Sequence, residues 1–490
     1  MKQTDSTLYD VIIIGAGISG IGTAYWLQRK CPGRQYAILE ARERLGGTWD
    51  LFRYPGIRSD SDMFTFGYRF RPWENPKSLS DGESIRKYLK ETAAENGIEA
   101  HIRFGHKVLA ANWSSEDRQW TLEVSHQEHT TTLKTRFLYM CAGYYSYEEG
   151  YRPGFPGEET FGGTLVHPQF WPQDLDYTGK RVAVIGSGAT AVTLVPSMAE
   201  KAAHVTMVQR SPTYIMKLPN RSGLYTALKK WLPGHLAYRL TRWRNLAMAM
   251  GLYGFSRAFP GKMKSLLMKG AARELPRGYP VEKHFNPTYK PWDQRLCVIP
   301  DGDLFKAIRS GKADIVTAEI AHFTPEGLAL KSGEVLDADI IVTATGLKMK
   351  LLGGARVTLD GRPLHTHEVL VYKGMMMSGV PNFALAFGYT NNSWTLKTDL
   401  TANLVCRILN YMDRKGYEVV VPQVPEDIEE EEFLPLDSGY MKRAKHLLPK
   451  NGSRRPWRVY QNYFMDMLLT RFGRVKDRHL SFDPGRDPHS

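Results

Sequence analysis

The sequence contains few cysteines, and none stands close to another. The four are Cys31, Cys141, Cys297 and Cys406. This spacing provides no CxxC pair, so it indicates neither a disulfide framework, nor a cysteine-ligated zinc site, nor a dithiol redox centre. We therefore expect no bound metal and a reducing compartment, which favours the cytoplasm.

Long apolar runs are also missing. A helix that spans a bilayer needs about 18 consecutive apolar residues, and the nearest candidate, 245–255, is shorter and lies between Arg244 and Arg257. The N-terminal region lacks a basic stretch followed by a long apolar one. Its apolar run 11–14 passes directly into glycines, as a first buried strand does. The sequence therefore predicts neither a membrane span nor an export signal.

Acidic residues are scarce in one segment. The net charge is +14, and between residues 217 and 290 fifteen Lys or Arg accompany only two Glu, a local excess of +13. Leu, Met and aromatic residues recur there at mixed helical spacing, which predicts amphipathic helices. Such a surface suits peripheral contact with anionic lipid or attraction of a phosphorylated cofactor, and it also suits a helical cap whose charges are solvated. No nucleic-acid-binding motif accompanies the charge, so we expect no nucleic acid partner.

The sequence does contain two glycine-rich nucleotide-binding patterns. The first, 10–40, reads as an apolar strand, a GxGxxG turn, a helical stretch and a second strand that ends in Glu40. The turn glycines are Gly15, Gly17 and Gly20. They permit a tight turn, backbone approach to a pyrophosphate and close packing of helix on strand, and Ser19 adds a hydroxyl. Glu40 stands where an acid accepts a hydrogen bond from a ribose 2′-hydroxyl, which favours an unphosphorylated adenosine such as that of FAD or NAD.

The second pattern, 180–210, repeats this design with one difference. Its strand ends not in an acid but in Arg210 followed by Ser211. A guanidinium beside a hydroxyl suits a 2′-phosphate, which an acid would repel, so the pattern favours NADP(H). The alternative is that Arg210 is an ordinary exposed residue at a strand end. The turn residues predicted to contact this cofactor are Gly186, Ser187, Gly188, Ala189, Thr190, Ala191 and Val192.

The placement of the two patterns predicts an interrupted domain. A chain of 490 residues exceeds what one core supports. Two apolar strands, 137–143 and 340–346, both close on small residues and resemble paired edges, and the second pattern lies wholly between them. We expect an α/β fold with two Rossmann-like dinucleotide-binding domains. The predicted parts are an FAD domain at 1–145, an NADP domain at 146–339 with a helical insertion at about 217–290, and the resumed FAD domain at 340–490.

Three further motifs accompany these patterns. Residues 46–60 read GGTWDLFRYPGIRSD, 161–172 read FGGTLVHPQFWP, and 291–297 read PWDQRLC. The first resembles the GGxWxxxxYPGxxxD motif, and the second the FxGxxxHxxxWP fingerprint, of the type I Baeyer-Villiger monooxygenases, a family of class B flavin monooxygenases. The resemblance covers essentially the whole chain. It is greatest to the ethionamide-activating monooxygenase group, which shares stretches such as VIGSGATAVTLVP and GYTNNSWTLKTDL.

The resemblance implies roles for individual residues. Those implied to contact the flavin are Gly47, Thr48, Trp49, Asp50 and Leu51, with Val108 near the adenine of FAD, and those implied to contact the nicotinamide cofactor are Arg58 and Ser59. Arg295 is similar to the family's catalytic arginine, with Asp60 in the active centre to orient it. A permanent cation suits this role because the peroxyflavin and the adduct it forms with a carbonyl are both anionic. Without the resemblance, the sequence favours a surface salt bridge for either residue, and only the family motif assigns them to the active centre.

The fingerprint 161–172 lies at the predicted crossing between the domains. We therefore expect His167 and Trp171 to control domain geometry rather than to contact substrate. In the returning segment, Lys373, Asn391, Asn392 and Trp394 are candidates for the wall of the FAD site, although amide and aromatic residues there would also suit a core.

The predicted function is that of an FAD- and NADPH-dependent Baeyer-Villiger monooxygenase. It would insert one oxygen atom of O2 beside a ketone carbonyl through a C4a-peroxyflavin, giving an ester or lactone, and would also oxidise sulfides. One alternative is an enzyme that acts mainly as an S- or N-oxygenase. A flavin disulfide reductase would require the dithiol that the cysteines do not supply. A catalytically silent NADPH-binding sensor is the alternative from another class.

Overall fold

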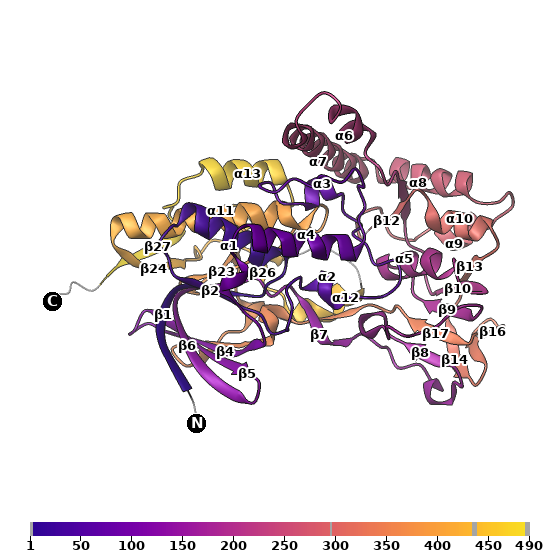
Figure 1. The fold of residues 1–490 in the computed structure, drawn as a ribbon, viewed down its shortest axis with the longest axis horizontal. Coiled ribbons are helices and arrows are strands. Elements are labelled where there is room, and N and C mark those ends of the chain that lie inside the picture. The colour runs from indigo at the N-terminus through magenta and orange to yellow at the C-terminus, as the bar shows by residue number, and fades with distance from the viewer. Residues whose placement is uncertain (1–2, 295, 434–438, 486–490) are drawn as a thin grey trace.

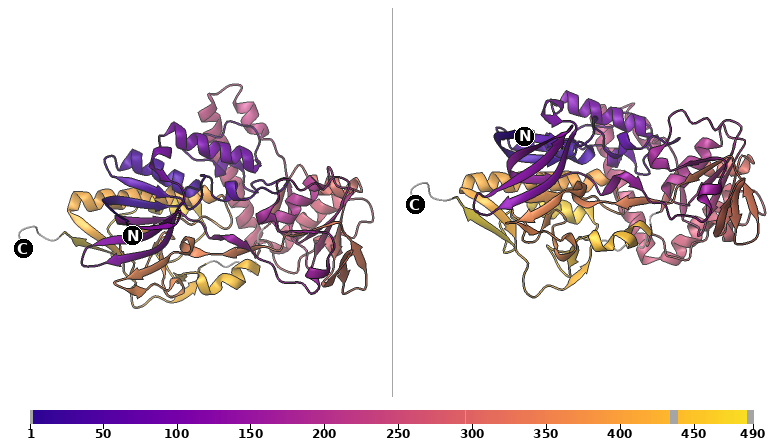
Figure 2. Two further views of the ribbon diagram at one scale, coloured as in Figure 1. Left: turned by 60° about the horizontal axis from the view of Figure 1, so that its bottom comes forward. Right: turned by 90° about the horizontal axis from the view of Figure 1, so that it is seen from below.

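The protein has two lobes, each built around a β-sheet (Figure 1). The computed structural model describes residues 3–294, 296–433 and 439–485. The first and last described residues lie in the same lobe, and the views in Figure 2 show that the second lobe is formed by the middle of the chain. The chain therefore leaves the first lobe, builds the second and returns, as the interrupted-domain prediction requires.

The first lobe contains a nine-stranded sheet. Its strands are β1 (Gln3–Ile14), β2 (Tyr36–Leu39), β3 (Ile102–Arg103), β4 (His106–Ser114), β5 (Gln119–His126), β6 (His129–Met140), β19 (Arg356–Leu359), β20 (Arg362–Pro363) and β23 (Phe383–Leu385). The order is β20, β19, β4, β5, β6, β1, β2, β3, and β23 also pairs with β6. Residues 11–14 of β1 are all β-branched, at most 7% exposed, and paired in parallel with β2 and β6. Such an apolar run is typical of a parallel strand covered on both faces.

Helices cover this sheet. They include α1 (Ile18–Lys30), α2 (Thr48–Leu51), α3 (Met63–Phe66), α4 (Gly82–Glu95), α11 (Trp394–Lys415), α12 (Gly439–Ala444) and α13 (Tyr463–Phe472). Helices α1 and α11 share one core, in which Ala24 and Leu27 pack with Val405 and Ile408. Short paired strands complete the lobe: β21 (Val371–Tyr372), β22 (Met376–Met377), β24 (Tyr417–Pro422), β25 (Glu430–Glu432), β26 (Lys450–Gly452) and β27 (Leu480–Pro484).

The second lobe contains a five-stranded parallel sheet in the order β13, β10, β9, β17, β8. Its strands are β8 (Thr164–Val166), β9 (Arg181–Ile185), β10 (His204–Gln209), β13 (Ala313–Thr317) and β17 (Ile340–Thr343), and its helices include α5 (Ala189–Met198) and α10 (Asp303–Arg309). A three-stranded sheet of β14 (Ile320–Thr324), β15 (Gly327–Leu330) and β16 (Val335–Asp337) lies beyond it in the chain.

Strand β17 corrects one prediction. The sequence predicted that residue 340 begins the resumed first domain and that 340–346 is an edge paired with 137–143. Instead, β17 pairs with β9 and β8 of the second sheet, whereas the strand ending at Met140 pairs with β1 and β23. An apolar strand that closes on small residues looks the same in either sheet, because only its pairing partner distinguishes the two.

A two-stranded ribbon connects the lobes. Strand β7 (Tyr145–Gly150) leads out of the first lobe, and β18 (Leu347–Met349) pairs with it in the antiparallel direction on the way back. The backbone N–H of Tyr151 donates to the carbonyl oxygen of Gly346 at 3.1 Å, which extends the ribbon. The two crossings therefore lie side by side rather than at separate points.

The predicted insertion is helical. It contains α6 (Gly223–Leu228), α7 (Gly234–Ala258), α8 (Pro260–Glu274) and α9 (Val281–Phe285), which follow β11 (Ile215–Leu218) and precede β12 (Cys297–Pro300). Helices α6 and α7 lie along the upper edge of the molecule in the view of Figure 1. Within the described ranges, every helix is too short or too polar to cross a membrane.

Candidate functional site

A cavity of about 600 Å³ is lined by residues of both lobes. Its walls come from the β1–α1 turn, the loop 46–61, the residues after β6, the first turn of α5 and the segment that precedes α11. It collects most of the residues that the sequence predicted for the flavin. The predicted residues that line it are Gly15, Gly17, Ser19, Glu40, Gly47, Thr48, Trp49, Leu51, Arg58, Ser59, Asp60, Val108, Ala189 and Thr190.

The β1–α1 turn is built for close backbone approach. Gly15 has φ +101°, a conformation that favours glycine. A Cβ at Gly20 would lie 1.9 Å from the carbonyl oxygen of Gly15, so this glycine serves packing and does not line the cavity. Helix α1 begins after Gly17 and has no acidic residue in its first turn. Its unpaired N–H groups are therefore free of a competing carboxylate and suit a pyrophosphate.

Glu40 is held at the end of β2. Its carboxylate accepts backbone hydrogen bonds from the N–H groups of Ala16 (2.7 Å) and Arg42 (3.0 Å). Burial raises the pKa of Glu40, and these two hydrogen bonds oppose that effect. The side chain is 6% exposed and lines the cavity. This arrangement fixes the orientation of an acceptor beside the turn, as recognition of a ribose hydroxyl requires.

The segment before α11 closes the cavity from the opposite side. The indole Nε1–H of Trp394 donates to Oγ of Ser19 at 2.8 Å. Of the four residues predicted for this wall, Trp394 and Asn392 line the cavity, whereas Lys373 and Asn391 do not. Tyr147, which the sequence analysis missed, also lines it. Burial raises the pKa of Tyr147 to about 12, and a hydrogen bond with Thr48 opposes the rise. No motif signals this tyrosine, because it lies in the ribbon strand β7 rather than in a glycine-rich turn.

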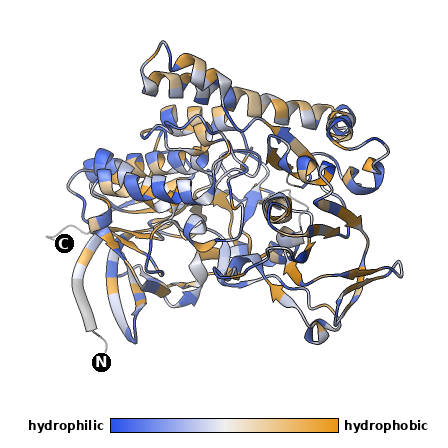
Figure 3. Cartoon of the chain, turned by 45° about the vertical axis from the view of Figure 1, so that its right-hand side comes forward, coloured by the Kyte–Doolittle hydropathy of each residue, from blue (hydrophilic) through white to orange (hydrophobic). Residues whose placement is uncertain are grey.

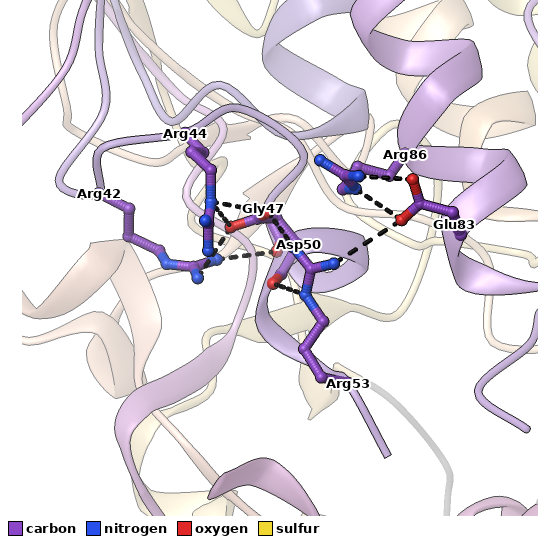
Figure 4. Close-up of polar contacts among 7 residues, drawn as sticks. All are labelled: Arg42, Arg44, Gly47, Asp50, Arg53, Glu83 and Arg86. Atoms are coloured by element: carbon purple, nitrogen blue, oxygen red, sulfur yellow. Dashed lines mark hydrogen bonds and ion pairs between the residues drawn. The ribbon is translucent and has the colours of Figure 1, made fainter. Parts of the chain in front are cut away.

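Asp50 is turned toward three arginines (Figure 4). Its side chain is fully buried and pairs with Arg42 at 2.9 Å, Arg44 at 3.2 Å and Arg53 at 2.6 Å. Within the motif at 46–60, residues 48–51 form the single helical turn α2. Thr48, Trp49 and Leu51 of this turn line the cavity, whereas Asp50 does not. The buried carboxylate of Asp50 thus holds α2 in place, and the other residues of α2 form part of the cavity wall.

The second half of the loop packs on the second lobe. Phe52 and Tyr54 belong to the core that contains Val184 and Val192. Arg58, which the resemblance assigns to the nicotinamide cofactor, lines the cavity and also pairs with Asp303 at the start of α10 at 2.5 Å. Burial raises the pKa of Asp303, and the guanidinium of Arg58 opposes that rise.

The remaining predicted loop residues lie where this segment turns back toward the first lobe. Ser59 is buried, and its Oγ donates to the carbonyl oxygen of Ser61 at 3.0 Å. Asp60 lines the cavity. Asp62, which the sequence analysis missed, accepts a hydrogen bond from the amide of Asn245 on α7 at 3.0 Å. Burial raises the pKa of Asp62 to about 6.

The second nucleotide turn lies at the carboxyl ends of β9 and β10. Gly186 has φ +137°, and a Cβ there would lie 2.4 Å from the carbonyl oxygen of Ala344, whereas a Cβ at Gly188 would meet open space. Helix α5 also lacks an acid in its first turn. Oγ of Ser187 donates to the carbonyl oxygen of Ser211 at 3.0 Å, and Arg210 is exposed. The open space at Gly188, the acid-free first turn of α5 and the exposed Arg210 therefore suit the binding of a phosphorylated dinucleotide.

Two residues predicted to contact the second cofactor belong to the core instead. Ala191 and Val192 are at most 1% exposed and pack with other buried side chains of the second lobe. Gly186, Ser187, Gly188, Arg210 and Ser211 surround the turn but do not line the main cavity. The predicted catalytic residue Arg295 lies outside the described residues.

The fingerprint residues lie on the connection between the lobes. A Cβ at Gly150, the last residue of β7, would come within 2.0 Å of the His167 ring, so the imidazole lies directly against the ribbon. Burial lowers the pKa of His167, which favours the neutral ring. Trp171 is 9% exposed in the core of the second lobe. Neither residue lines the cavity, consistent with a role in domain geometry.

Comparisons with known sequences match one family profile and one domain profile. The profile of the flavin-binding monooxygenase-like family matches residues 57–230, and that of an NAD(P)-binding Rossmann-like domain matches residues 13–81. The chain is 53% identical to the FAD-containing monooxygenase EthA of Mycolicibacterium smegmatis over 480 residues, 98% of each protein. It is 49% identical to the probable FAD-binding monooxygenase AlmA of Acinetobacter baylyi over 482 residues, 98% of this chain and 97% of that protein.

Solved structures show the same fold at lower identity. An oxidized steroid monooxygenase bound to NADP superimposes with a TM-score of 0.78 at 22% identity, over 98% of this chain and all of the other. OTEMO in complex with FAD and NADP superimposes with a TM-score of 0.71 at 23% identity, over 86% and 88% of the two chains. Both nucleotide turns and the cavity therefore belong to a fold that holds these two cofactors in other proteins.

Proposed function

The chain belongs to the family of FAD-containing, flavin-binding monooxygenases, and from this premise we propose that it is a Baeyer-Villiger monooxygenase that converts a ketone to an ester or lactone. Its cofactors are FAD and NADPH. Bound together, they supply the electrons and the activated oxygen atom from O2. A thioether would be a second class of substrate, because oxygen transfer to sulfur generates no oxyanion that the protein must stabilise.

One observation carries the proposal. A single cavity is lined both by the first turn of α1, at Gly17 and Ser19, and by the first turn of α5, at Ala189 and Thr190. Two dinucleotides bound at these helix N-termini would converge on the same space. The buried acceptor Glu40 fits the unphosphorylated ribose of FAD, whereas the exposed Arg210 fits the 2′-phosphate of NADPH.

The protein residues would act by binding, orientation and charge. Helices α1 and α5 present N–H groups to the two pyrophosphates, and the α2 turn anchored by Asp50 forms the cavity wall at Thr48 and Trp49. Arg295, to which the resemblance assigns the catalytic role, would stabilise the negative charge that develops on the ketone oxygen. Asp60 would orient its guanidinium through a charge-assisted hydrogen bond.

The test compares two substrates and two variants. Purified FAD-loaded enzyme is incubated with NADPH and either an aliphatic ketone or a thioether, and NADPH consumption and products are quantified. The wild type should form an ester from the ketone and a sulfoxide from the thioether. Arg295→Ala should lose ester formation by at least about 100-fold, retain FAD and retain sulfoxide formation. Arg277→Ala, which removes an exposed arginine of the helical insertion, is the matched control and should behave as the wild type.

Two results would contradict the proposal. Absence of ester from every ketone in a panel, with sulfoxide still formed, would leave an S-oxygenase. NADPH-dependent flavin reduction without any oxygenated product would indicate a sensor instead.

A further inference from the structure

Helix α7 exposes large apolar side chains to solvent, although some of its polar side chains are buried. The residues that form the outer face of α7 are Leu236, Leu240, Trp243, Met248 and Phe255, each at least 36% exposed. Its buried residues are both apolar and polar: Ala237, Tyr238, Thr241, Arg242, Leu246 and Ser256. The outer face of a helix on a soluble domain is normally polar. The exposed apolar side chains indicate that something apolar covers the outer face.

Buried hydrogen bonds fix this orientation. The guanidinium of Arg242 donates to the carbonyl oxygens of Phe64 and Gly67, both at 2.8 Å, and to that of Thr65 at 3.1 Å. Asn245 donates to the carboxylate of Asp62. Rotating α7 to bury its apolar face would break these bonds and leave the C-terminal end of α3 and the buried cation without partners. The outer face of α7 is therefore a stable feature of the folded protein.

The apolar surface continues onto α13. Trp243 stacks on Phe464 with ring centroids 6.2 Å apart. Phe464 begins an i, i+4, i+8 row that continues with Leu468, 55% exposed, and Phe472, 75% exposed. Before α7, Trp231 is 86% exposed. Figure 3 shows hydrophobic and hydrophilic residues interspersed along the long helix at the top of the molecule.

The charges beside this surface are positive. Exposed basic residues flank it on three elements: Lys229, Lys230, Arg239, Arg244 and Arg471. The segment 217–290 as a whole carries a net charge of +13. Two copies of this chain would therefore repel each other if they met through this face, whereas a negatively charged partner would be attracted.

We propose that the outer face of α7, together with the α13 row, docks on an anionic lipid bilayer. The aliphatic and aromatic side chains would enter the boundary between headgroups and acyl chains, and the flanking Lys and Arg would contact lipid phosphates. Trp231 and Trp243 would lie at headgroup depth, where amphipathic aromatic rings are favoured. The protein would bind peripherally, without a spanning segment.

Helix α7 also contacts a residue of the cavity wall. Met250 receives a hydrogen bond from Asn392 at 3.5 Å, and Asn392 lines the cavity. If the proposed function holds, this position favours apolar ketones or thioethers that are dissolved in the bilayer. The lipid-binding proposal itself does not depend on the reaction.

The experiment is co-sedimentation of the FAD-loaded enzyme with vesicles. The wild type should sediment with vesicles of phosphatidylcholine and phosphatidylglycerol, sediment much less with phosphatidylcholine alone, and dissociate as salt rises. Leu240→Glu combined with Met248→Glu should reduce binding by at least about tenfold. Arg239→Gln and Arg244→Gln should each reduce it about fivefold. Val335→Glu, which adds one negative charge at an apolar residue 56% exposed on β16, is the control for adding Glu to an exposed apolar position elsewhere.

All variants are first checked for FAD content and circular dichroism, so that loss of fold is not read as loss of binding. Failure of the wild type to bind anionic vesicles would overturn the proposal. So would equal loss of binding in the Val335→Glu control and the α7 variant. Concentration-dependent dimerisation that Leu240→Glu with Met248→Glu abolishes, without vesicle binding, would show that a second copy covers this face instead.

Discussion

Asp50 offers a direct test of how the cavity wall is held. Replacing it by Asn preserves its shape but removes the charge that three guanidiniums share at 2.6, 2.9 and 3.2 Å. Removing one partner of a fully buried ion pair costs about 3–5 kcal/mol. Here the three arginine side chains are 26–64% exposed, so water takes over part of the interaction. We therefore expect Asp50→Asn to lower the free energy of unfolding by about 2 kcal/mol.

The assay is urea denaturation of the FAD-loaded enzyme, followed by circular dichroism and by release of FAD. The FAD dissociation constant should also rise, because Thr48, Trp49 and Leu51 lie on the turn that Asp50 anchors. Glu83→Gln is the control. Glu83 pairs with Arg86 and with Arg53 of the same cluster, but its side chain is 64% exposed, so the expected loss is below about 0.5 kcal/mol. Equal losses in the two variants would refute the argument from burial.

Three further predictions concern the second nucleotide turn and a buried acid. Gly188→Ala should leave the free energy of unfolding within about 0.5 kcal/mol of the wild type, because the added methyl meets open space. It should weaken NADPH binding about tenfold, because the methyl occupies the space through which the pyrophosphate approaches the backbone. Unchanged NADPH affinity in calorimetry would contradict this. Arg210→Ala should weaken NADPH about tenfold and leave NADH unchanged; equal effects on both would exclude the 2′-phosphate role. Asp62 has an ordinary pKa of 3.8 that burial raises to about 6, so the native state binds the proton more tightly than the unfolded state. Its contribution to stability should fall as pH rises from 4 to 6 and stay low above 6. Asp62→Asn should abolish this fall and be more stable than the wild type at pH 8 by up to about 3 kcal/mol in urea titrations; identical pH profiles would show that Asp62 does not titrate in this range.

The two nucleotide turns could be predicted from sequence because their requirements are local. Gly15, Gly20 and Gly186 are needed where a Cβ would meet backbone, and the apolar strand before each turn pairs in parallel as expected. The terminal residues Glu40 and Arg210 likewise follow from their position at the ends of strands. Such features depend on a few residues that are adjacent in the chain, so they can be predicted from one sequence.

Features that depend on distant partners were not predictable in this way. The sheet to which β17 belongs and the pairing of Arg58 with Asp303 arise from contacts between segments that are far apart in the chain or in different lobes. Tyr147 and Asp62 carry no motif, and only their burial and position reveal them. The sequence predicted where ligands approach the backbone more successfully than which side chains hold each other.

The paired crossings through β7 and β18 constrain the order of folding on the ribosome. The strands of the second sheet, β8 to β17, are synthesised without interruption. In the first sheet, β4 pairs with β19 and β6 pairs with β23, and both of these partners are synthesised only after the second lobe is complete. During that interval the outer edge of β4 and the end of β6 remain unpaired, and exposed strand edges promote aggregation. The first lobe begins synthesis early yet finishes last, so slow translation of the insertion would lengthen the period in which its nascent sheet needs a chaperone.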